Sequence, residues 1–237
     1  MPVTLARTTP LLPLAVLPLA LLAAAPASAA TRDWPLRGFD RIDLAAAADV
    51  GVRVGPGFAV HAEGDQAGID ALEPSLRGGT LVLGWRKGTH NLHLRSELHV
   101  TVTMPRIAGA TVSGAGRVRI DRVEAPSFTG DVAGAGQLIL PVVRTRATVL
   151  GVSGTGSIDA AGLTGRLDAR VSGVGSIDAR GLAGRAGRLT VSGTGNVAAR
   201  IDGPAQVAMS GLGNVTVLGN PRCQVSRTGL GSVECGG

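Results

Sequence analysis

The chain has 237 residues, of which 36 are glycine, 44% are hydrophobic and only 2% are aromatic. This apolar content excludes wholesale disorder, because disordered chains lack the hydrophobic residues that offset their conformational entropy, and the scarcity of rings argues against an aromatic binding cleft. The net charge is +6, and Lys87 is the single lysine, so arginine carries nearly all of the positive charge.

Residues 1–29 have the pattern of a signal peptide. Arg7 gives a basic start, an apolar run broken by two prolines spans 11–25, and Ala27-Ser28-Ala29 reads as a small-residue cleavage site. Removal of this segment takes away one arginine and no acid, so the net charge falls from +6 to +5. We therefore expect an exported protein, located in the periplasm or at the cell surface, with no membrane-spanning segment after processing.

Residues 30–108 are predicted to form an irregular β section that continues into a solenoid and covers its N-terminal end. Short segments in this section alternate or run apolar between Gly and Pro breaks, namely 39–44, 50–54, 58–61, 80–83 and 98–104. Residues 69–76 are compatible with one short helical turn.

Residues 109–237 contain an internal repeat. The pentapeptide Val-Ser-Gly-x-Gly or a close variant occurs seven times, and its first glycine stands at positions 114, 134, 154, 173, 193, 211 and 229. Seven copies at this nearly constant period predict a solenoid whose units stack on one another. Tight corners need glycine for positive φ or for close backbone approach, and the expected corner glycines are Gly114, Gly116, Gly134, Gly136, Gly154, Gly156, Gly173, Gly175, Gly193, Gly195, Gly211, Gly213, Gly229 and Gly231.

The residues after each second glycine alternate between polar and aliphatic, which is typical of a strand with one buried face. Ile158 and Ile177 belong to an inward column, whereas Ser157 and Ser176 have the outward parity. Identical columns stack only if successive turns run parallel, about 4.8 Å apart. The predicted fold is therefore all-β, a right-handed parallel β-helix (solenoid) with coils of about 18–20 residues.

Two further columns carry expectations about packing. An apolar column that follows the second strand of each unit is expected to be buried, and it contains Val123, Val143, Leu163 and Leu182. The repeated serines are expected to form a ladder of hydroxyl hydrogen bonds between turns, and they are Ser113, Ser153, Ser172, Ser192 and Ser210.

Cys223 and Cys235 both lie near the C-terminus. In an exported chain such a pair most simply forms a disulfide, which here would act as a C-terminal cap on the last coil. Cys235 has the inward parity, so its sulfur is expected to be buried. A zinc site is disfavoured, because no histidine follows His99 to complete a tetrahedral shell with two thiols.

The order of these segments resembles a known family. Phe-Asp-Arg-Ile-Asp at 39–43, Gly-Thr-Leu-Val-Leu at 79–83 and Val-Thr-Val-Thr-Met-Pro at 100–105 precede the Val-Ser-Gly-x-Gly ladder. This arrangement is similar to the secreted bacterial family described as putative auto-transporter adhesin, head GIN domain, a domain of unknown function, and the resemblance covers 39–235. The family has no established catalytic residues, so the resemblance implies none here.

Asp159 and Asp178 are the sharpest candidates for chemistry. They occupy one column in adjacent coils, so their carboxylates are expected about 5 Å apart, the spacing of the acid pair in retaining glycosidases. Such a pair could also bind calcium, or could simply be a solvated surface pair near Arg170 and Arg180. Residues 129–237 contain no aromatic side chain that would stack on a sugar, which favours the surface pair.

The remaining motifs indicate no cofactor. The Gly-x-Gly pairs lack the third glycine and the helix of a dinucleotide site, and Lys87 follows no glycine-rich loop. His90, His93 and His99 could hold a transition metal, although exposed loop histidines explain them more simply. The arginines are scattered along the sequence, so anionic glycans or other envelope components are conceivable partners, without specific nucleic-acid binding.

The sequence as a whole predicts an exported, non-catalytic β-solenoid of the cell envelope, an adhesion-like, scaffold or binding module. The alternative is a carbohydrate-active β-helix enzyme, a polysaccharide lyase or hydrolase, that uses Asp159 and Asp178.

Overall fold

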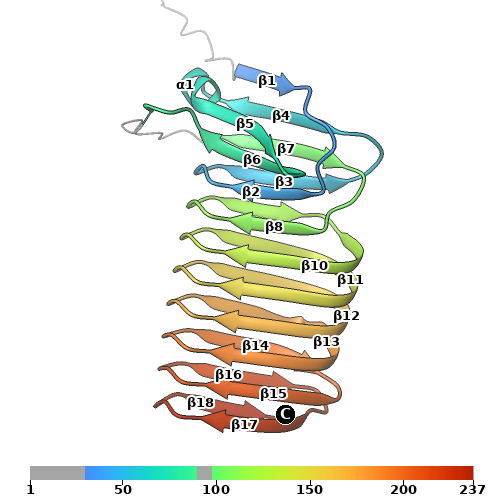
Figure 1. Ribbon diagram of the computed structural model, residues 1–237, viewed down its shortest axis with the longest axis vertical. Helices are drawn as coiled ribbons and strands as arrows, with labels where there is room; N and C mark the ends of the chain where they lie inside the picture. Colours follow the sequence, from blue (N-terminus) through green and yellow to red (C-terminus); the bar gives the residue numbers. More distant parts are fainter. Residues whose placement is uncertain (1–29, 90–97, 237) are drawn as a thin grey trace, which may run out of the picture.

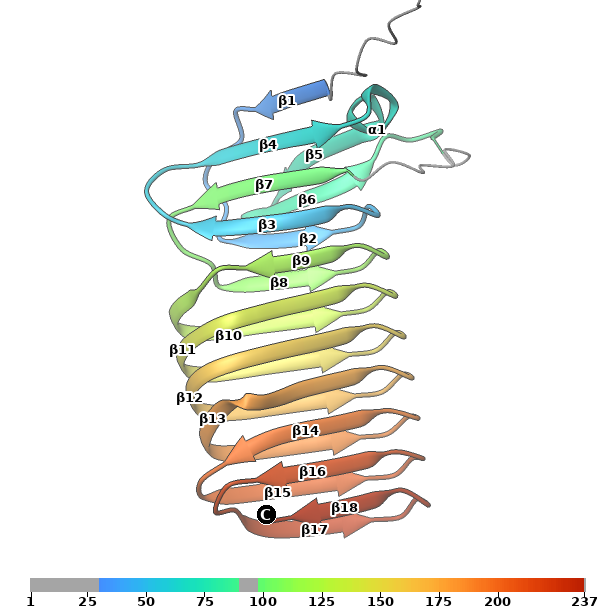
Figure 2. The ribbon, with the colours of Figure 1, turned by 180° about the vertical axis from the view of Figure 1, so that it is seen from behind.

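The Val-Ser-Gly-x-Gly repeats wind into a right-handed β-solenoid of about six turns (Figures 1 and 2). The structure is a computed structural model, and it describes residues 30–89 and 98–236. Strands make up 66% of the chain and helix 3%. The all-β parallel β-helix predicted from the repeat is therefore confirmed, whereas the proposed signal peptide at 1–29 lies outside the described residues.

Each coil of the solenoid body contributes to two walls that are joined at two edges. A strand of the first wall leads into the Gly-x-Gly corner and a strand of the second wall leaves it; a bend then returns the chain to the first wall (Figure 1). The strands of the body are β8 (Gly109–Val112), β9 (Arg117–Ile120), β10 (Val123–Val132), β11 (Gln137–Val152), β12 (Ser157–Val171), β13 (Ser176–Val191), β14 (Asn196–Ile201), β15 (Pro204–Met209), β16 (Asn214–Leu218), β17 (Arg222–Arg227) and β18 (Ser232–Cys235).

The two edges differ in sequence, and each is defined here by its residues. The corner edge, on the left of Figure 1, comprises 113–116, 133–136, 153–156, 172–175, 192–195, 210–213 and 228–231. The bend edge, on the right, comprises 121–127, 141–147, 161–166, 180–186, 200–204 and 218–222.

Successive coils are parallel and in register within the walls. Ile158 pairs with Ile177, and Asp159 pairs with Asp178, on strands β12 and β13. Ile158 and Ile177 are at most 1% exposed, whereas the neighbouring Ser157 and Ser176 are partly exposed. The predicted parity is therefore confirmed, and the aliphatic column forms a continuous core between the two walls.

The apolar column predicted at the bend edge is wrong at one position. The register shifts between Leu140 and Val143, so Val143 lies opposite Gly162 rather than Leu163, and Leu163 is 60% exposed. Gly162, with φ of 127°, in turn lies opposite the buried Leu182. The physical reason is that this repeat is shorter by a single position, and the bend absorbs the difference by turning Leu163 outward.

The corner glycines are explained by close approach and not by positive φ. None of them has a positive φ, but a Cβ on Gly173 would overlap the carbonyl oxygen of Gly154 one coil above. The same overlap recurs between Gly193 and Gly173. At this edge the backbones of adjacent coils therefore pack directly against each other, which leaves no space for a side chain.

The predicted ladder of serine hydroxyls is wrong. Ser113 donates its hydroxyl to Asp43, at 2.7 Å, but the other repeated serines make no such bond within the described chain. Their backbone amides carry the contact between coils instead: the amide of Ser192, for example, donates to the carbonyl of Val171 at 2.9 Å. Because neighbouring backbones already satisfy each other at the corner, the hydroxyls point to solvent.

In the N-terminal section the coils stack in an order that differs from their order in the sequence. The coil formed by β2 and β3 lies between the β8–β9 coil and the coil formed by β6 and β7, with parallel pairing on both sides. Antiparallel strands then cover the end: β4 pairs with β7 and β1, and β5 pairs with β6. The strands of this section are β1 (Ala30–Trp34), β2 (Arg41–Leu44), β3 (Asp49–Val54), β4 (Ala59–Gly64), β5 (Leu72–Arg77), β6 (Thr80–Trp85) and β7 (His99–Met104).

A short helix lies at the same end of the solenoid (Figure 1). Helix α1 spans Gln66–Ala71, and the side chain of Asp65 accepts a hydrogen bond from the amide of Gly68 at its N-terminus, at 3.2 Å. The helical turn expected over 69–76 is therefore placed too late in the sequence, because the residues from Leu72 onward form strand β5.

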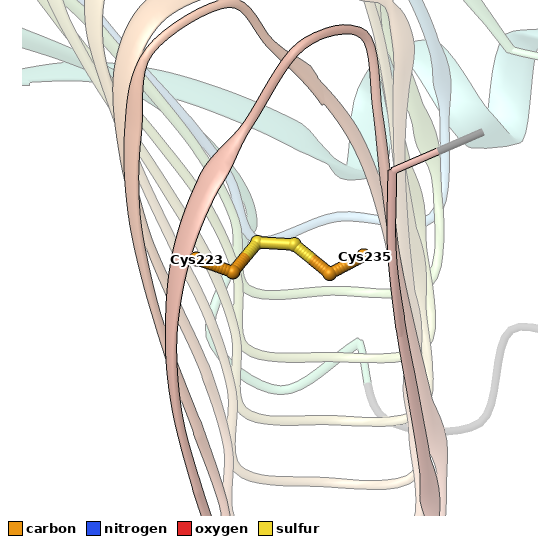
Figure 3. Close-up of a disulfide and its surroundings, with 2 residues drawn as sticks. All are labelled: Cys223 and Cys235. Carbon is orange, nitrogen blue, oxygen red and sulfur yellow. A yellow bond between two sulfur atoms is a disulfide. The ribbon is translucent and has the colours of Figure 1, made fainter.

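A disulfide between Cys223 of β17 and Cys235 of β18 spans the two walls at the C-terminal end (Figure 3). Their Cα atoms are 6.6 Å apart. The expected burial of Cys235 is wrong: the residue is exposed, because no further coil stacks beneath the last one. Arg227 also covers this end, where its guanidinium donates to the carbonyl of Gly231 at 2.9 Å.

Candidate functional site

A groove of about 790 Å³ runs along the second-wall side of the corner edge and crosses several coils. The groove is open because many of the corner residues that line it are glycine or alanine, whose small side chains do not fill it. A column of polar side chains forms one side of this corner groove, and its members are Asp49, Arg117, Gln137, Ser157, Ser176 and Asn196.

Hydrogen bonds between coils occupy the N-terminal half of this polar column. Arg117 lies 3.5 Å from Asp49 and donates its Nε to Gln137 at 3.1 Å. Gln137 in turn donates its Nε2 to Asp159 at 2.8 Å. These side chains bridge neighbouring turns, so their polar groups are largely engaged in holding the coils together.

The same arrangement continues toward the C-terminus. Asn196 accepts hydrogen bonds from both the amide and the side chain of Asn214, each at 3.1 Å. The hydroxyl of Ser232 donates to Asn214 at 2.6 Å. Polar contacts between coils therefore occur at both ends of the column, around Arg117 and Gln137 and around Asn196.

The register places Asp159 and Asp178 side by side, but the two carboxylates have different partners. Asp159 accepts from Gln137, whereas Asp178 is held by the guanidinium of Arg180. The hydrogen bond from Arg180 lowers the pKa of the Asp178 carboxyl below its usual value, although desolvation opposes the effect. A general acid needs a raised pKa, so this environment disfavours Asp178 in that role.

Each histidine of the described residues lies near a carboxylate. Nδ1 of His61 lies 2.9 Å from Asp33, and Nδ1 of His99 lies 3.9 Å from Asp49. Within 30–89 and 98–236, no group of three His, Cys, Asp or Glu side chains could hold a metal ion. His90 and His93, the other two members of the hypothetical metal site, lie outside the described residues.

Two acidic residues on the first wall were not singled out from the sequence. Asp131 sits over Gly151, where a Cβ would overlap its carboxylate, and partial burial raises the pKa of the Asp131 carboxyl. Asp168 pairs with Arg170 through Oδ2 at 2.8 Å, while its Oδ1 is buried without a hydrogen-bond partner among the described residues. The sequence signal that could have revealed Asp131 is its alignment with Gly151 in the next repeat, since a glycine leaves room for the carboxylate.

The bend edge brings arginines together that the sequence leaves scattered. Its segments 141–147, 161–166 and 180–186 contain five arginines and no acidic residue, and of the five only Arg180 pairs with a carboxylate, that of Asp178. A recess of about 550 Å³ lies among them, and its lining includes Arg146, Arg185 and Leu163. The prediction that the arginines are scattered over the coils is therefore wrong for this edge, because the folding of the coils brings several of them together.

These observations define a class of protein: a β-solenoid with repeated polar surfaces along its length. The chain belongs to the family described as putative auto-transporter adhesin, head GIN domain, whose model matches residues 38–221. The resemblance noted from the sequence is thereby confirmed.

Solved structures support the fold. A putative adhesin from Bacteroides fragilis has a TM-score of 0.78 at 20% identity, covering 88% of this chain and 97% of that chain. A putative adhesin from Parabacteroides merdae has a TM-score of 0.67 at 15% identity, covering 88% and 96%. A structure titled putative lipid binding protein from Parabacteroides distasonis has a TM-score of 0.68 at 17% identity, covering 88% and 97%. No curated protein matches the chain.

Proposed function

We propose that this chain is an exported, non-catalytic module of the cell envelope that binds a surface or polymer and so acts in adhesion or as a scaffold. The observation that carries the proposal is the column of polar side chains along the corner groove, together with the arginine-lined recess in the middle of the bend edge. A ligand laid along the axis would contact many coils at once. The family description and the adhesin titles of two structural neighbours support the same role.

The proposed export, to the periplasm or the cell surface, rests on two features. Residues 1–29 have the composition of a signal peptide, and the Cys223–Cys235 disulfide suits an oxidising compartment. Among the described residues, no helix is long and apolar enough to cross a bilayer.

Export is tested by fractionating cells that produce the full chain and sequencing the N-terminus of the exported protein. We expect a mature chain that begins at Ala30 and contains no free thiol. A chain retained in the cytoplasm with its N-terminus intact would contradict the proposal.

The binding role is tested by incubating the exported protein with a panel of acidic and neutral polysaccharides and with whole envelopes, with and without calcium. We expect retention on at least one of these materials without release of reducing ends or unsaturated sugars. Release that is lost in Asp159→Asn and Asp178→Asn would instead support the alternative, a polysaccharide lyase or hydrolase.

A further inference from the structure

Four arginines of the three middle bends, 141–147, 161–166 and 180–186, are exposed and have no acidic partner within the described chain. They are Arg144, Arg146, Arg166 and Arg185. Among the described residues, none of the four forms an ion pair with a carboxylate, in contrast to Arg180 and Arg200. Unpaired arginines keep their planar donor groups available for an external carboxylate, sulfate or phosphate.

The register staggers these arginines instead of stacking them. Thr145 pairs with Thr164 and Thr164 pairs with Gly184, so Arg146, Gly165 and Arg185 follow one another in a single column. A Cβ on Gly165 would lie 2.6 Å from the carbonyl oxygen of Arg146. No side chain fits at Gly165, so the column has no charge between Arg146 and Arg185, which are two coils, or about 10 Å, apart.

The neighbouring column contains Arg144 and Arg200, and these two residues together with Arg146 and Arg185 are here called the frame. Arg144 pairs with Leu163, Leu163 with Ala183, and Ala183 with Arg200. The recess thus has an apolar patch, Leu163 and Ala183, with arginines above and below it. A sugar ring presents an apolar C–H face and acidic substituents at its rim, and this arrangement matches both.

The hydroxyls inside the recess are already committed. Thr145 donates to Thr164 at 2.9 Å, and Thr164 donates to the carbonyl of Arg166 at 3.0 Å. The arginines are therefore the groups with hydrogen-bonding capacity to spare.

In the part of the chain that the structure describes, acidic residues flank this frame at its ends. Asp202 lines the recess, but its carboxylate lies 4.0 Å from Arg200 and accepts from the amide of Asn220 at 3.0 Å. Glu124 lies one coil above, opposite Arg144. The local charge is thus positive over the middle coils and falls off toward both ends.

We propose that the bend edge binds a linear acidic polysaccharide, with its carboxylates or sulfates on Arg144, Arg146 and Arg185 and a sugar face on Leu163. The proposal rests on the binding role proposed above and names the ligand class and the site. A chain fits the recess better than a membrane does, because the recess is a hollow of about 550 Å³ that a flat lipid surface does not enter.

The test compares two triple variants of the full exported chain that remove the same charge. R144Q/R146Q/R185Q alters the frame, whereas R53Q/R77Q/R119Q removes three exposed arginines from outside the bend edge. The probes are polygalacturonate, its methyl-esterified neutral form, and phosphatidylglycerol vesicles, measured by calorimetric titration at two ionic strengths. Thermal melting establishes that both variants are folded.

We expect polygalacturonate, and not its ester, to bind, with affinity lowered about tenfold or more in the frame variant, a factor that corresponds to about 1.4 kcal/mol. The control variant should lose no more than about twofold, because distant charges are screened by salt. Asp202→Asn should strengthen binding, since it removes the acid from the recess.

Three results would overturn the assignment. If both triple variants lose the same affinity for polygalacturonate, the loss is explained by net charge alone and not by the frame. Binding of the vesicles alone, lost in the frame variant, would identify a lipid surface instead. If the frame variant binds polygalacturonate with full affinity, the glycan binds elsewhere on the protein and the proposed binding function still holds. The proposed function itself fails only if the chain binds no polysaccharide and no envelope material.

Discussion

The corner edge and the bend edge of the same coils respond differently to changes in repeat length. At the corner edge every unit keeps two glycines, because the backbone of one coil packs directly on the next. The register shifts between parallel coils all fall after the second-wall strand, where the bend edge begins. The corners therefore fix the spacing of the coils, and the bends absorb the variation in repeat length and carry the unpaired charge.

The largest expected effect compares two residues that the repeat assigns to buried apolar columns. Ile177→Asp places a charge without a partner in the core and should destabilise the fold by about 4 kcal/mol or more. Leu163→Asp should leave stability nearly unchanged, because Leu163 is 60% exposed at the bend edge. Denaturant unfolding of the two variants measures the difference. Equal losses would show that the bend is packed as tightly as the walls.

A second comparison tests the corner itself. Gly173→Ala should cost about 3 kcal/mol, since its Cβ would overlap the carbonyl oxygen of Gly154 and the coils would have to separate. Gly51→Ala is the matched control, because a Cβ at Gly51 meets nothing within 4 Å. Thermal melting of both variants should show a drop for the first alone. A tolerated alanine at residue 173 would contradict the role of close approach at the corner.

The third prediction concerns the disulfide that joins the two walls within the last coil. The double variant Cys223→Ser, Cys235→Ser should keep its repeats folded but lose up to about 3 kcal/mol of local stability in the last coil. Strands β17 and β18 each pair with one neighbour, so a frayed end exposes unpaired backbone groups to another chain. Size-exclusion chromatography should show more self-association, with hydrogen exchange increased only in the last coil. An unchanged oligomer distribution and melting curve would contradict this.

The smallest effects are expected from two acids whose pKa values shift in opposite directions. Arg180 lowers the pKa of Asp178, so the ion pair stabilises the fold above the unfolded-state pKa, and that stability is lost as the pH falls through the lower, folded value. Burial raises the pKa of Asp131, so its ionisation destabilises the fold as the pH rises.

At pH 7, Asp178→Asn should therefore lower the melting temperature slightly, and Asp131→Asn should raise it slightly. Both differences should shrink toward acid pH, where the carboxyls are protonated. Melting curves of the two variants between about pH 2 and pH 7 measure this, and shifts of the same sign would contradict the assignments.

The sequence predicts the walls well because each side chain of a strand points either into the core or out to solvent, and the two orientations alternate. Once Ile158 and Ile177 are assigned inward, counting from the corner glycines gives the orientation of every side chain up to the next bend. The bend is harder: Leu163 is apolar, yet a register shift by a single position turns it to solvent. The hydrophobic pattern does not distinguish the shifted register from the unshifted one, in which Leu163 would be buried opposite Val143.

The candidate glycan site was missed for the same reason. Arg146, Arg166 and Arg185 each occupy the same position relative to the first glycine of their repeats, so counting alone would stack them on one another. The register instead sets Arg166 beside the column that contains Arg146 and Arg185, which keeps like charges apart. The recess follows from this stagger, and only the register of the bend reveals it.

The placement of the β2–β3 coil has a consequence for how the chain folds. In the repeats, Leu138 meets Ile158 of the very next repeat, so each coil can add to the one before it. Arg41 meets Gly109, which lies beyond the whole N-terminal section, and its other neighbour, Thr80, is also synthesised later. Contacts of high sequence separation slow folding. The β2–β3 coil is therefore the first to be synthesised, but both of its neighbouring coils, β6–β7 and β8–β9, are made after it.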